Sequence, residues 1–325
     1  MKALLCKTLE GPQSLVIEDM PDPVAGEGEV VVQVMAAALN HFDTLITRGK
    51  YQTKPTLPFS PCGEIAGRIA AVGPDVTDWT AGQRVMAYLG FGGARGRVAV
   101  PAGRLVAIPD SVTDEVACGI AITYGTALHG LRERAGLQPG ETVAVLGAAG
   151  GAGLAAVEIA KVLGANVIAV ASTADKLAVC REHGADETVS SQDGELNAAL
   201  RALTDGRGAD VVYDCVGGAL AEPAFRALAW KGRYLVIGFA SGDIPKLPLN
   251  LFLLKGAAAL GVFWGEAVRR SPAVHRSDMA FILDAIRDGR LNPHIHAALP
   301  ANRFAEAFGI LERREAVGKV VLTDW

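Results

Sequence analysis

The amino-acid sequence predicts an α/β protein that combines an all-β, barrel-like domain with a doubly wound parallel sheet. Residues 1–109 contain short apolar stretches separated by Gly, Pro and Asp, a pattern typical of closely spaced β-strands. From Glu141 onward, apolar stretches alternate with amphipathic ones, which predicts parallel strands covered by helices on both faces. A chain of 325 residues is long enough for two such domains.

The elements expected in the N-terminal part are short. The predicted strands are Ala3–Lys7, Leu15–Glu18, Val30–Met35, Glu64–Val72, Arg84–Tyr88, Val98–Val100 and Leu105–Ile108. Ser111 and Asp114 then have the spacing of a capping box at a helix N-terminus. A long helix is expected after them, with an interruption at Thr123–Thr126.

The alternating part predicts a parallel sheet and then a return of the chain to the first domain. The predicted strands of the sheet are Thr142–Leu146, Asn166–Val170, Thr188–Ser190, Ala209–Cys215, Arg233–Gly238 and Ala258–Phe263. Helices are expected between them, for example at Asp175–His183 and Gly194–Leu203. The returning elements are a helix, a strand, a helix and a strand at Ser277–Asp288, Pro293–Ala298, Ala301–Arg313 and Lys319–Leu322.

Charge and hydropathy argue against several classes of partner. The formal net charge is −4 and the chain has no long run of Lys and Arg, which disfavours nucleic acid and anionic membranes. The most apolar stretch, Leu247–Trp264, is interrupted by Lys255 and Gly256 and is short for a membrane span. The N-terminus lacks the hydrophobic region of a signal peptide. Five scattered cysteines suit a reducing compartment, so we expect a cytoplasmic protein.

The segment Thr142–Gly153 is the most informative motif. An apolar strand turns through a glycine-rich loop into a helical stretch that Gly164 can end. The loop has Ala148, Gly150 and Gly153 at the three fingerprint positions, with alanine at the first. In this strand–loop–helix context, backbone N–H groups at the helix N-terminus can bind a pyrophosphate. The segment therefore predicts a dinucleotide-binding site.

The end of the second strand of this domain indicates which dinucleotide is bound. An acidic residue there would bind the ribose 2′-OH of NAD, but the strand ends in Ala171-Ser172-Thr173. Asp175 belongs instead to the first turn of the next helix, where negative charge is favourable. Ser172 and Lys176 can contact a 2′-phosphate, which favours NADPH. The alternatives are that Ser172 caps the helix and that Lys176 is a solvated charge.

Nearly the whole chain resembles the medium-chain dehydrogenase/reductase superfamily, and specifically its zinc-free quinone oxidoreductase branch. The matching segments are Asn40–Tyr51, Glu64–Gly67, Tyr124–Ala127, Gly147–Gly153, Gly184–Asp186, Asp214–Gly218, Gly238–Gly242, Gly261–Gly265 and Gly318–Val320. This resemblance implies a catalytic domain built on a GroES-like β-barrel, at residues 1–120 and 261–325, and an inserted Rossmann domain that binds NADPH at residues 121–260. It also implies a homodimer that pairs through the strand at Ala258–Phe263.

The resemblance places the cofactor in a cleft between the two domains. Asn40 and Thr126 are expected near the nicotinamide and its ribose, and Gly150, Gly151 and Ala152 near the pyrophosphate. The residues expected to flank the cleft are Phe239, Phe263, Trp264 and Lys319. The candidate cofactor-binding set is completed by Ala149, Gly153, Ser172, Lys176, Val216, Gly238 and Ala240.

No metal site is expected. Zinc-dependent relatives carry a cysteine where this chain has Asn40 and a histidine where it has Gly63. His294 and His296 would share one face of a strand, but no third ligand is evident nearby. Without zinc there is no Lewis acid to stabilise an alkoxide. Hydride transfer then suits acceptors that are already electron-poor, namely quinones and activated C=C bonds.

The catalytic candidates are Asn40, Tyr51 and Asp43. A phenol with a pKa of about 10 can donate a hydrogen bond or a proton at neutral pH, although Tyr51 could instead anchor the Gly49–Pro58 loop. Asp43 could order the segment from Asn40 to Tyr51, and solvent could supply the proton. The predicted function is NADPH-dependent, zinc-independent reduction of quinones or α,β-unsaturated carbonyls. The alternatives are an alkene reductase of the enoyl-thioester or acrylate type and a non-catalytic NADPH-binding accessory protein.

Overall fold

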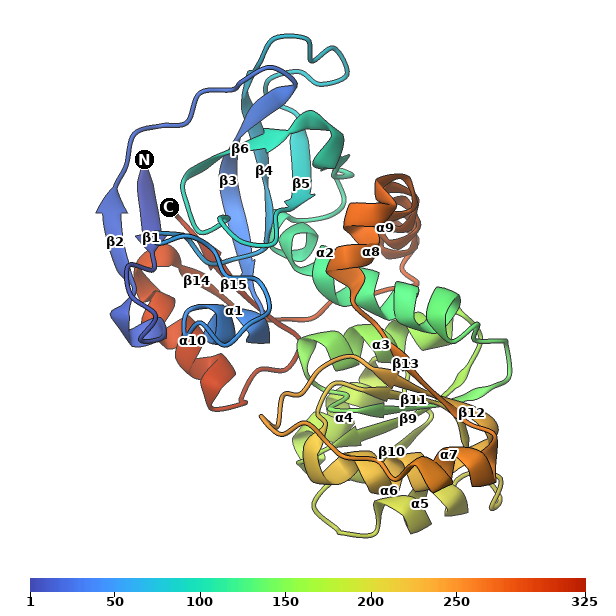
Figure 1. Ribbon diagram of the computed structural model, residues 1–325. Helices are drawn as coiled ribbons and strands as arrows, with labels where there is room; N and C mark the ends of the chain where they lie inside the picture. The colour runs from blue at the N-terminus through green and yellow to red at the C-terminus, as the bar shows by residue number, and fades with distance from the viewer. The chain divides into compact units, whose positions relative to one another are not determined.

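The computed structural model describes all residues from Met1 to Trp325 and divides into two compact units (Figure 1). The first unit contains Met1–Ile122, Ser271–Asp288 and Pro293–Trp325. The second unit contains Thr123–Arg270 and Gly289–Asn292. No helix in the structure is both long enough and apolar enough to cross a membrane.

The first unit is built on a seven-stranded sheet in the order β14-β15-β3-β4-β5-β7, with β6 also paired to β3. A separate antiparallel pair, β1-β2, lies beside it. The strands are β1 Lys2–Leu5, β2 Val16–Asp19, β3 Glu29–Leu39, β4 Glu64–Val72, β5 Arg84–Tyr88, β6 Arg97–Pro101, β7 Leu105–Ala107, β14 Ile295–Pro300 and β15 Lys319–Thr323. The helices of this unit are α1 His41–Ile46, α9 Pro272–Arg287 and α10 Phe304–Glu312, together with the first part of α2 Asp114–Leu128.

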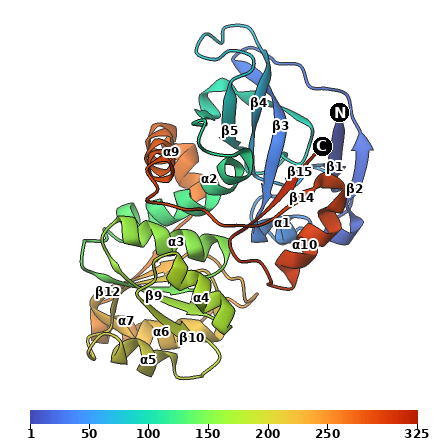
Figure 2. The same ribbon diagram turned by 180° about the vertical axis from the view of Figure 1, so that it is seen from behind.

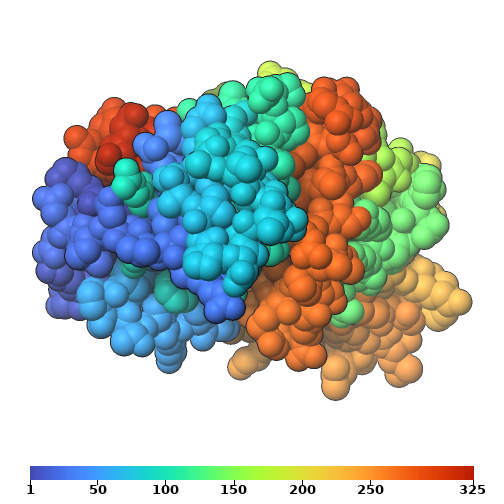
Figure 3. Space-filling view, turned by 90° about the horizontal axis from the view of Figure 1, so that it is seen from above, coloured from blue at the N-terminus to red at the C-terminus, as the bar shows by residue number.

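The two ends of the chain meet in the first unit. The C-terminal strand β15 pairs antiparallel with β3, so that Val320 lies opposite Leu39. Figure 3 shows C-terminal residues, in red, beside N-terminal residues, in blue. Apolar side chains from β3, β4, β5 and β15 form one buried core. The pairing of β15 with β3 sets Lys319 beside Asn40, which is the residue that follows β3.

The second unit is a six-stranded parallel sheet in the order β10-β9-β8-β11-β12-β13. The strands are β8 Thr142–Leu146, β9 Asn166–Ala171, β10 Glu187–Ser190, β11 Ala209–Asp214, β12 Leu228–Val236 and β13 Ala258–Gly261. The helices are α3 Gly151–Val162, α4 Ala174–Glu182, α5 Leu196–Ala202, α6 Ala221–Arg226, α7 Leu249–Lys255 and α8 Trp264–Arg270. Right-handed connections place α3 and α4 on one face and α5 and α6 on the other (Figures 1 and 2).

The predicted fold class is confirmed, and most strands lie within a few residues of their expected positions. The expected helix interruption at Thr123–Thr126 is wrong, because α2 runs unbroken from Asp114 to Leu128. The ring of Trp264 fills the space beside Gly125, where a Cβ atom would lie only 2.7 Å from the ring. Glycine therefore serves helix packing at this position and does not break the helix.

The expected capping box at Ser111 is also wrong. Thr113 precedes the first residue of α2, and its hydroxyl accepts a hydrogen bond of 3.3 Å from Val116 N. The expected strand at Arg233–Gly238 begins earlier, at Leu228. Helices α6 and α7 lie between strands, where helices were expected without stated bounds, whereas the short helix α8 was not predicted.

Candidate active site

Except for Thr126, which lies in α2, the candidate cofactor-binding residues of the second unit follow the carboxyl ends of parallel strands. The loop Ala149–Gly153 follows β8, Ser172 and Lys176 follow β9, and Val216 follows β11. Gly238–Ala240 follow β12, and Phe263 and Trp264 follow β13. The carboxyl ends of parallel strands share one edge of a sheet, which is where doubly wound folds bind ligands.

The glycine-rich loop forms a close turn between β8 and α3. The N–H groups of Gly147 and Ala148 both donate to Val170 O at 3.0 Å, which fixes the loop against β9. A Cβ atom on Gly153 would lie 2.1 Å from Gly147 O, so only glycine fits there. Helix α3 begins at Gly151, and the N–H groups of its first turn have no acceptor within the helix. They can therefore bind an anion.

The residues after β9 separate two roles that the sequence left open. Thr173 is the N-cap of α4, and its hydroxyl accepts from Lys176 N at 3.3 Å. Ser172 is half-buried, and its hydroxyl is not the cap of α4. The cap is therefore supplied by Thr173, which leaves the Ser172 hydroxyl available to a ligand.

The loops after β11 and β12 are held together by backbone hydrogen bonds. Asp214 Oδ1 accepts from Val216 N at 2.7 Å and from Gly217 N at 2.9 Å, which shapes the first loop. Ala240 N then donates to Cys215 O at 3.1 Å, across the two loops. The structure thus brings Val216 and Gly238–Ala240 together, as one wall of the candidate site.

The end of β13 contributes two aromatic residues with different exposures. Trp264 is buried against Gly125, the residue that precedes Thr126 in α2. Phe263 is 58% exposed. Within the second unit, Trp264 is therefore part of the packing that positions Thr126, whereas the ring of Phe263 remains available for a ligand.

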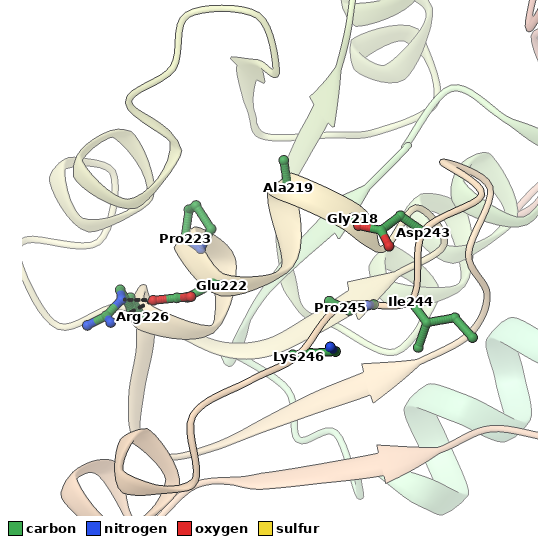
Figure 4. Close-up of a pocket in the computed structure, with 9 residues that line it drawn as sticks. All are labelled: Gly218, Ala219, Glu222, Pro223, Arg226, Asp243, Ile244, Pro245 and Lys246. Carbon is green, nitrogen blue, oxygen red and sulfur yellow. Dashed lines mark hydrogen bonds and ion pairs between the residues drawn. The ribbon is translucent and has the colours of Figure 1, made fainter.

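A separate hollow of about 630 Å³ lies between α6 and the loop at residues 243–246. Figure 4 shows its charged residues, with Glu222 and Arg226 paired on α6 and Asp243 and Lys246 on the loop. Two acidic and two basic side chains balance one another. The hollow therefore has no net charge that would select an anionic or cationic ligand.

The candidate residues of the first unit form a buried polar cluster. Lys319 Nζ donates to Asn40 Oδ1 at 2.7 Å, Glu64 Oε1 at 2.8 Å and Leu39 O at 3.2 Å. Asn40 Nδ2 donates to Glu64 Oε1 at 3.0 Å, and Glu64 Oε2 accepts from Ile122 N at 2.8 Å. Glu64 and Lys319 are almost completely buried. A buried ion pair of this kind depends on satisfied hydrogen bonds.

Asp43 connects this cluster to the backbone around it. Its Oδ2 accepts from Asn40 N at 2.8 Å and its Oδ1 accepts from Cys62 N at 2.9 Å. Burial raises the pKa of Asp43 to about 7, and the two backbone N–H groups and Lys319 oppose that increase. Asp43 therefore fixes the start of α1 and the position of Cys62, whose φ is 63°.

Tyr51 lies against Phe42, with ring centroids 5.1 Å apart and an angle of 24° between the planes. Burial raises the pKa of Tyr51, and the charge of Asp43 raises it further. The phenol therefore remains protonated at neutral pH and can donate a hydrogen bond. The stacking also fits the alternative that Tyr51 anchors its loop.

The acidic and amide groups of the cluster do not fit a metal ion. The Lys319 ammonium already donates hydrogen bonds to oxygen atoms of Asn40 and Glu64. It therefore occupies the position that a metal ion would need in order to bind these oxygens. His296 Nδ1 accepts from Val317 N at 3.4 Å, which gives that histidine a backbone partner. No group of three or more His, Cys, Asp or Glu residues is arranged to hold a metal.

The interactions of two buried carboxylates, Glu64 and Glu158, were not predicted from the sequence. Glu64 is the first residue of an apolar strand, and its link to Lys319 joins positions 255 residues apart. Glu158 is the one charged residue among the buried positions of α3. A glutamate in the middle of an otherwise apolar helix is a usable signal, because a buried carboxylate requires partners.

Two family profiles match this chain. The one described as an alcohol dehydrogenase GroES-like domain matches residues 26–110, and the one described as a zinc-binding dehydrogenase matches residues 151–280. The chain is 39% identical over 325 residues to a quinone oxidoreductase-like protein 2 homolog from Nematostella vectensis, covering 99% of this chain and 88% of that relative.

Solved structures of similar proteins cover the same length. The mycobacterial protein Rv1454c, complexed with NADPH, has a TM-score of 0.92 and 30% identity and covers 99% of this chain and 100% of its own. The CurK enoyl reductase has a TM-score of 0.89 and 26% identity, with 99% of both chains covered. The likeness therefore extends over both units.

Proposed function

The chain belongs to the quinone oxidoreductase branch of the medium-chain dehydrogenase/reductase superfamily, and from this premise we propose that it reduces quinones or α,β-unsaturated carbonyl compounds with NADPH, without a metal ion. The observation that carries the proposal is the position of Lys319. Its ammonium donates hydrogen bonds to Asn40 and Glu64, so the oxygens of these residues are not available to bind a metal ion as a Lewis acid. Acceptors that are electron-poor before they bind need none.

NADPH is the proposed cofactor. When bound, it supplies the hydride, and the protein supplies orientation and hydrogen bonds. The N–H groups of Gly151, Ala152 and Gly153 bind the pyrophosphate, with Ala149 and Gly150 shaping the approach to it. Ser172 and Lys176 bind the 2′-phosphate, which fits a Ser172 hydroxyl that is not used to cap α4. NADPH in the related mycobacterial structure supports this assignment.

The remaining cofactor-binding residues are assigned to the nicotinamide ribose and ring. In the second unit they are Thr126, Val216, Gly238, Phe239, Ala240, Phe263 and Trp264. In the first unit, Asn40 is assigned to contact with the nicotinamide ring, and Lys319 acts through Asn40. Lys319 has all three of its donors engaged within the first unit, which supports an indirect role.

Tyr51 is the proposed donor to the acceptor oxygen. Negative charge develops on that oxygen when hydride adds to a quinone or to the β-carbon of an enone, and a positioned O–H stabilises it. The raised pKa of Tyr51, caused by burial, keeps its proton in place at neutral pH. The carboxyl group of Asp43 positions Asn40 by accepting a hydrogen bond from the backbone N–H of Asn40.

We also propose that the protein is a cytoplasmic homodimer. Strand β13 is an edge of the parallel sheet, and its residues are largely exposed. On the neighbouring helix α7, Leu249 and Leu253 are about 80% exposed. An unpaired edge beside exposed leucines favours pairing with a second copy. The five free thiols fit a reducing compartment.

The proposal is tested by NADPH oxidation with the purified protein. A panel of quinones is compared with matched enones and acrylyl-CoA, and NADH is run in parallel. Fast turnover of quinones or enones with NADPH is the expected result. Selective turnover of acrylyl-CoA would instead favour an alkene reductase, which the likeness to an enoyl reductase supports. Tight NADPH binding without any turnover would identify a non-catalytic accessory protein.

A further inference from the structure

The side-chain amide of Asn40 is held between a cation and an anion. Its Oδ1 lies 2.7 Å from Lys319 Nζ, and its Nδ2 lies 3.0 Å from Glu64 Oε1. An ammonium group has three donors and no acceptor, so the atom that faces it must be oxygen. An ionised carboxylate only accepts, so the atom that faces it must be nitrogen. Two charges of opposite sign therefore fix the same orientation of the amide.

The hydrogen-bonding atoms of Lys319 and Glu64 all have partners within the protein. The three N–H bonds of Lys319 are directed at Asn40, Glu64 and Leu39. Glu64 uses its second oxygen for Ile122 N at 2.8 Å. Lys319 is 4% exposed and Glu64 0%, whereas Asn40 is 9% exposed. The one donor of this trio that remains for a ligand is the second N–H of Asn40.

We infer that Lys319 and Glu64 are positioning residues that present Asn40 as a hydrogen-bond donor to the oxygen of the substrate. This inference rests on the proposed function and assigns a donor to the carbonyl oxygen that these acceptors share. The Lys319 cation polarises the amide through Oδ1 and strengthens the N–H as a donor. Such a donor stabilises an oxygen that gains negative charge. The Asn40 N–H is not a base, so it cannot remove a proton from a substrate hydroxyl.

The competing explanation is that the Lys319–Glu64 pair only holds β3, β4 and β15 together. Removing one partner would leave a buried charge without its counterion, and the variant could fail to fold for that reason alone. The double variant Lys319→Met with Glu64→Gln removes both charges at similar volume. A glutamine can either donate to Asn40 or accept from it, so the double variant keeps a hydrogen-bonded cluster but loses the fixed orientation.

The first readout is the Asn40 amide itself. The chain has six asparagines, so selective ¹⁵N-asparagine labelling gives few side-chain NH₂ signals, and Asn40→Ser assigns the one of interest. We expect one sharp pair of signals for Asn40 in the wild-type protein and a broadened or doubled pair in the double variant. Lys161→Met removes a surface partner of Asp186 in the second unit and should leave the Asn40 signals unchanged.

The second readout separates positioning from folding. In the double variant we expect a melting temperature close to that of the wild type and, at saturating NADPH, a kcat for quinones or enones at least tenfold lower. A kcat within threefold of the wild type, with a single sharp pair of Asn40 signals, would overturn the inference. A wild-type protein without any turnover would refute the proposed function, while the NMR signals would still test the orientation of Asn40.

Discussion

The phenol of Tyr124 donates a hydrogen bond of 2.8 Å to Glu158 Oε2 in the interior of the second unit. The same oxygen accepts from Asn292 N at 3.1 Å, and Glu158 Oε1 pairs with His183 Nδ1. Glu158 is 5% exposed, so its charge depends on these partners rather than on water. One carboxylate on α3 therefore connects α2, the C-terminal end of α4 and the short segment Gly289–Asn292.

Replacing Tyr124 by phenylalanine should destabilise the protein. The change removes a donor from a buried carboxylate and is expected to lower the free energy of unfolding by about 1–3 kcal/mol. Burial and the neighbouring Glu158 raise the pKa of Tyr124, so the lost group is a protonated donor at every pH of interest. Urea denaturation of the variant and the wild type measures the difference.

Tyr213→Phe is the matched control for this experiment. The hydroxyl of Tyr213 is also buried, but it has no hydrogen-bond partner in the structure. Its removal relieves an unsatisfied polar group and should leave stability unchanged or raise it by about 1 kcal/mol. Equal losses in the two variants would show that the hydrogen bond to Glu158 is not the source of the effect.

Asp43 should give the folding stability a distinctive dependence on pH. Its pKa rises from the ordinary 3.8 to about 7 on folding, mainly because the carboxyl is buried. The folded protein therefore holds a proton that the unfolded chain has released, and stability from this group falls as pH rises from about 4 to about 7. Between pH 5 and pH 7 the expected loss is roughly 2–3 kcal/mol.

Asp43→Asn isolates this contribution, because the amide does not titrate. We expect the variant to be less stable than the wild type at pH 5. Its NH₂ group cannot accept a hydrogen bond, yet it must face a backbone N–H that donates to a carboxyl oxygen in the wild type. The difference in the free energy of unfolding between the two proteins should then become smaller toward pH 8. Urea denaturation at several pH values measures it, and parallel curves for the two proteins would contradict the assignment.

The sequence was sufficient to predict the parts of the fold that depend on local pattern. The strand, loop and helix from Thr142 to Gly153 are recognisable because glycine is required where a side chain would meet Gly147 O. The position of Lys319 was not predictable in this way. A lysine is normally exposed, and this one is buried because β15 pairs with β3 from the far end of the chain. That pairing is a tertiary contact without a local signal.

Two glycines of the loop should respond differently to alanine. At Gly153 a Cβ atom would lie 2.1 Å from Gly147 O, so Gly153→Ala is expected to destabilise the second unit by about 3 kcal/mol. At Gly150 the nearest atom would be 3.5 Å away, so the fold should tolerate Gly150→Ala. Its methyl group would instead restrict the approach of the pyrophosphate and raise the Kd for NADPH by roughly tenfold. Thermal melts and NADPH titrations distinguish the two effects, and equal stability of the two variants would refute the clash.

Ser172→Asp should convert the cofactor preference toward NADH. Ser172 lies directly after β9, where a carboxylate would accept from the ribose 2′-OH of NADH and repel the 2′-phosphate of NADPH. We expect the Kd for NADPH to rise by about a hundredfold, while the Kd for NADH falls. Thr173→Ala is the control, because it removes the cap of α4 and should cost about 1 kcal/mol of stability without changing the ratio of the two Kd values. If Thr173→Ala changes that ratio as much as Ser172→Asp does, the selectivity depends on the order of the α4 N-terminus, and Ser172 does not contact the phosphate.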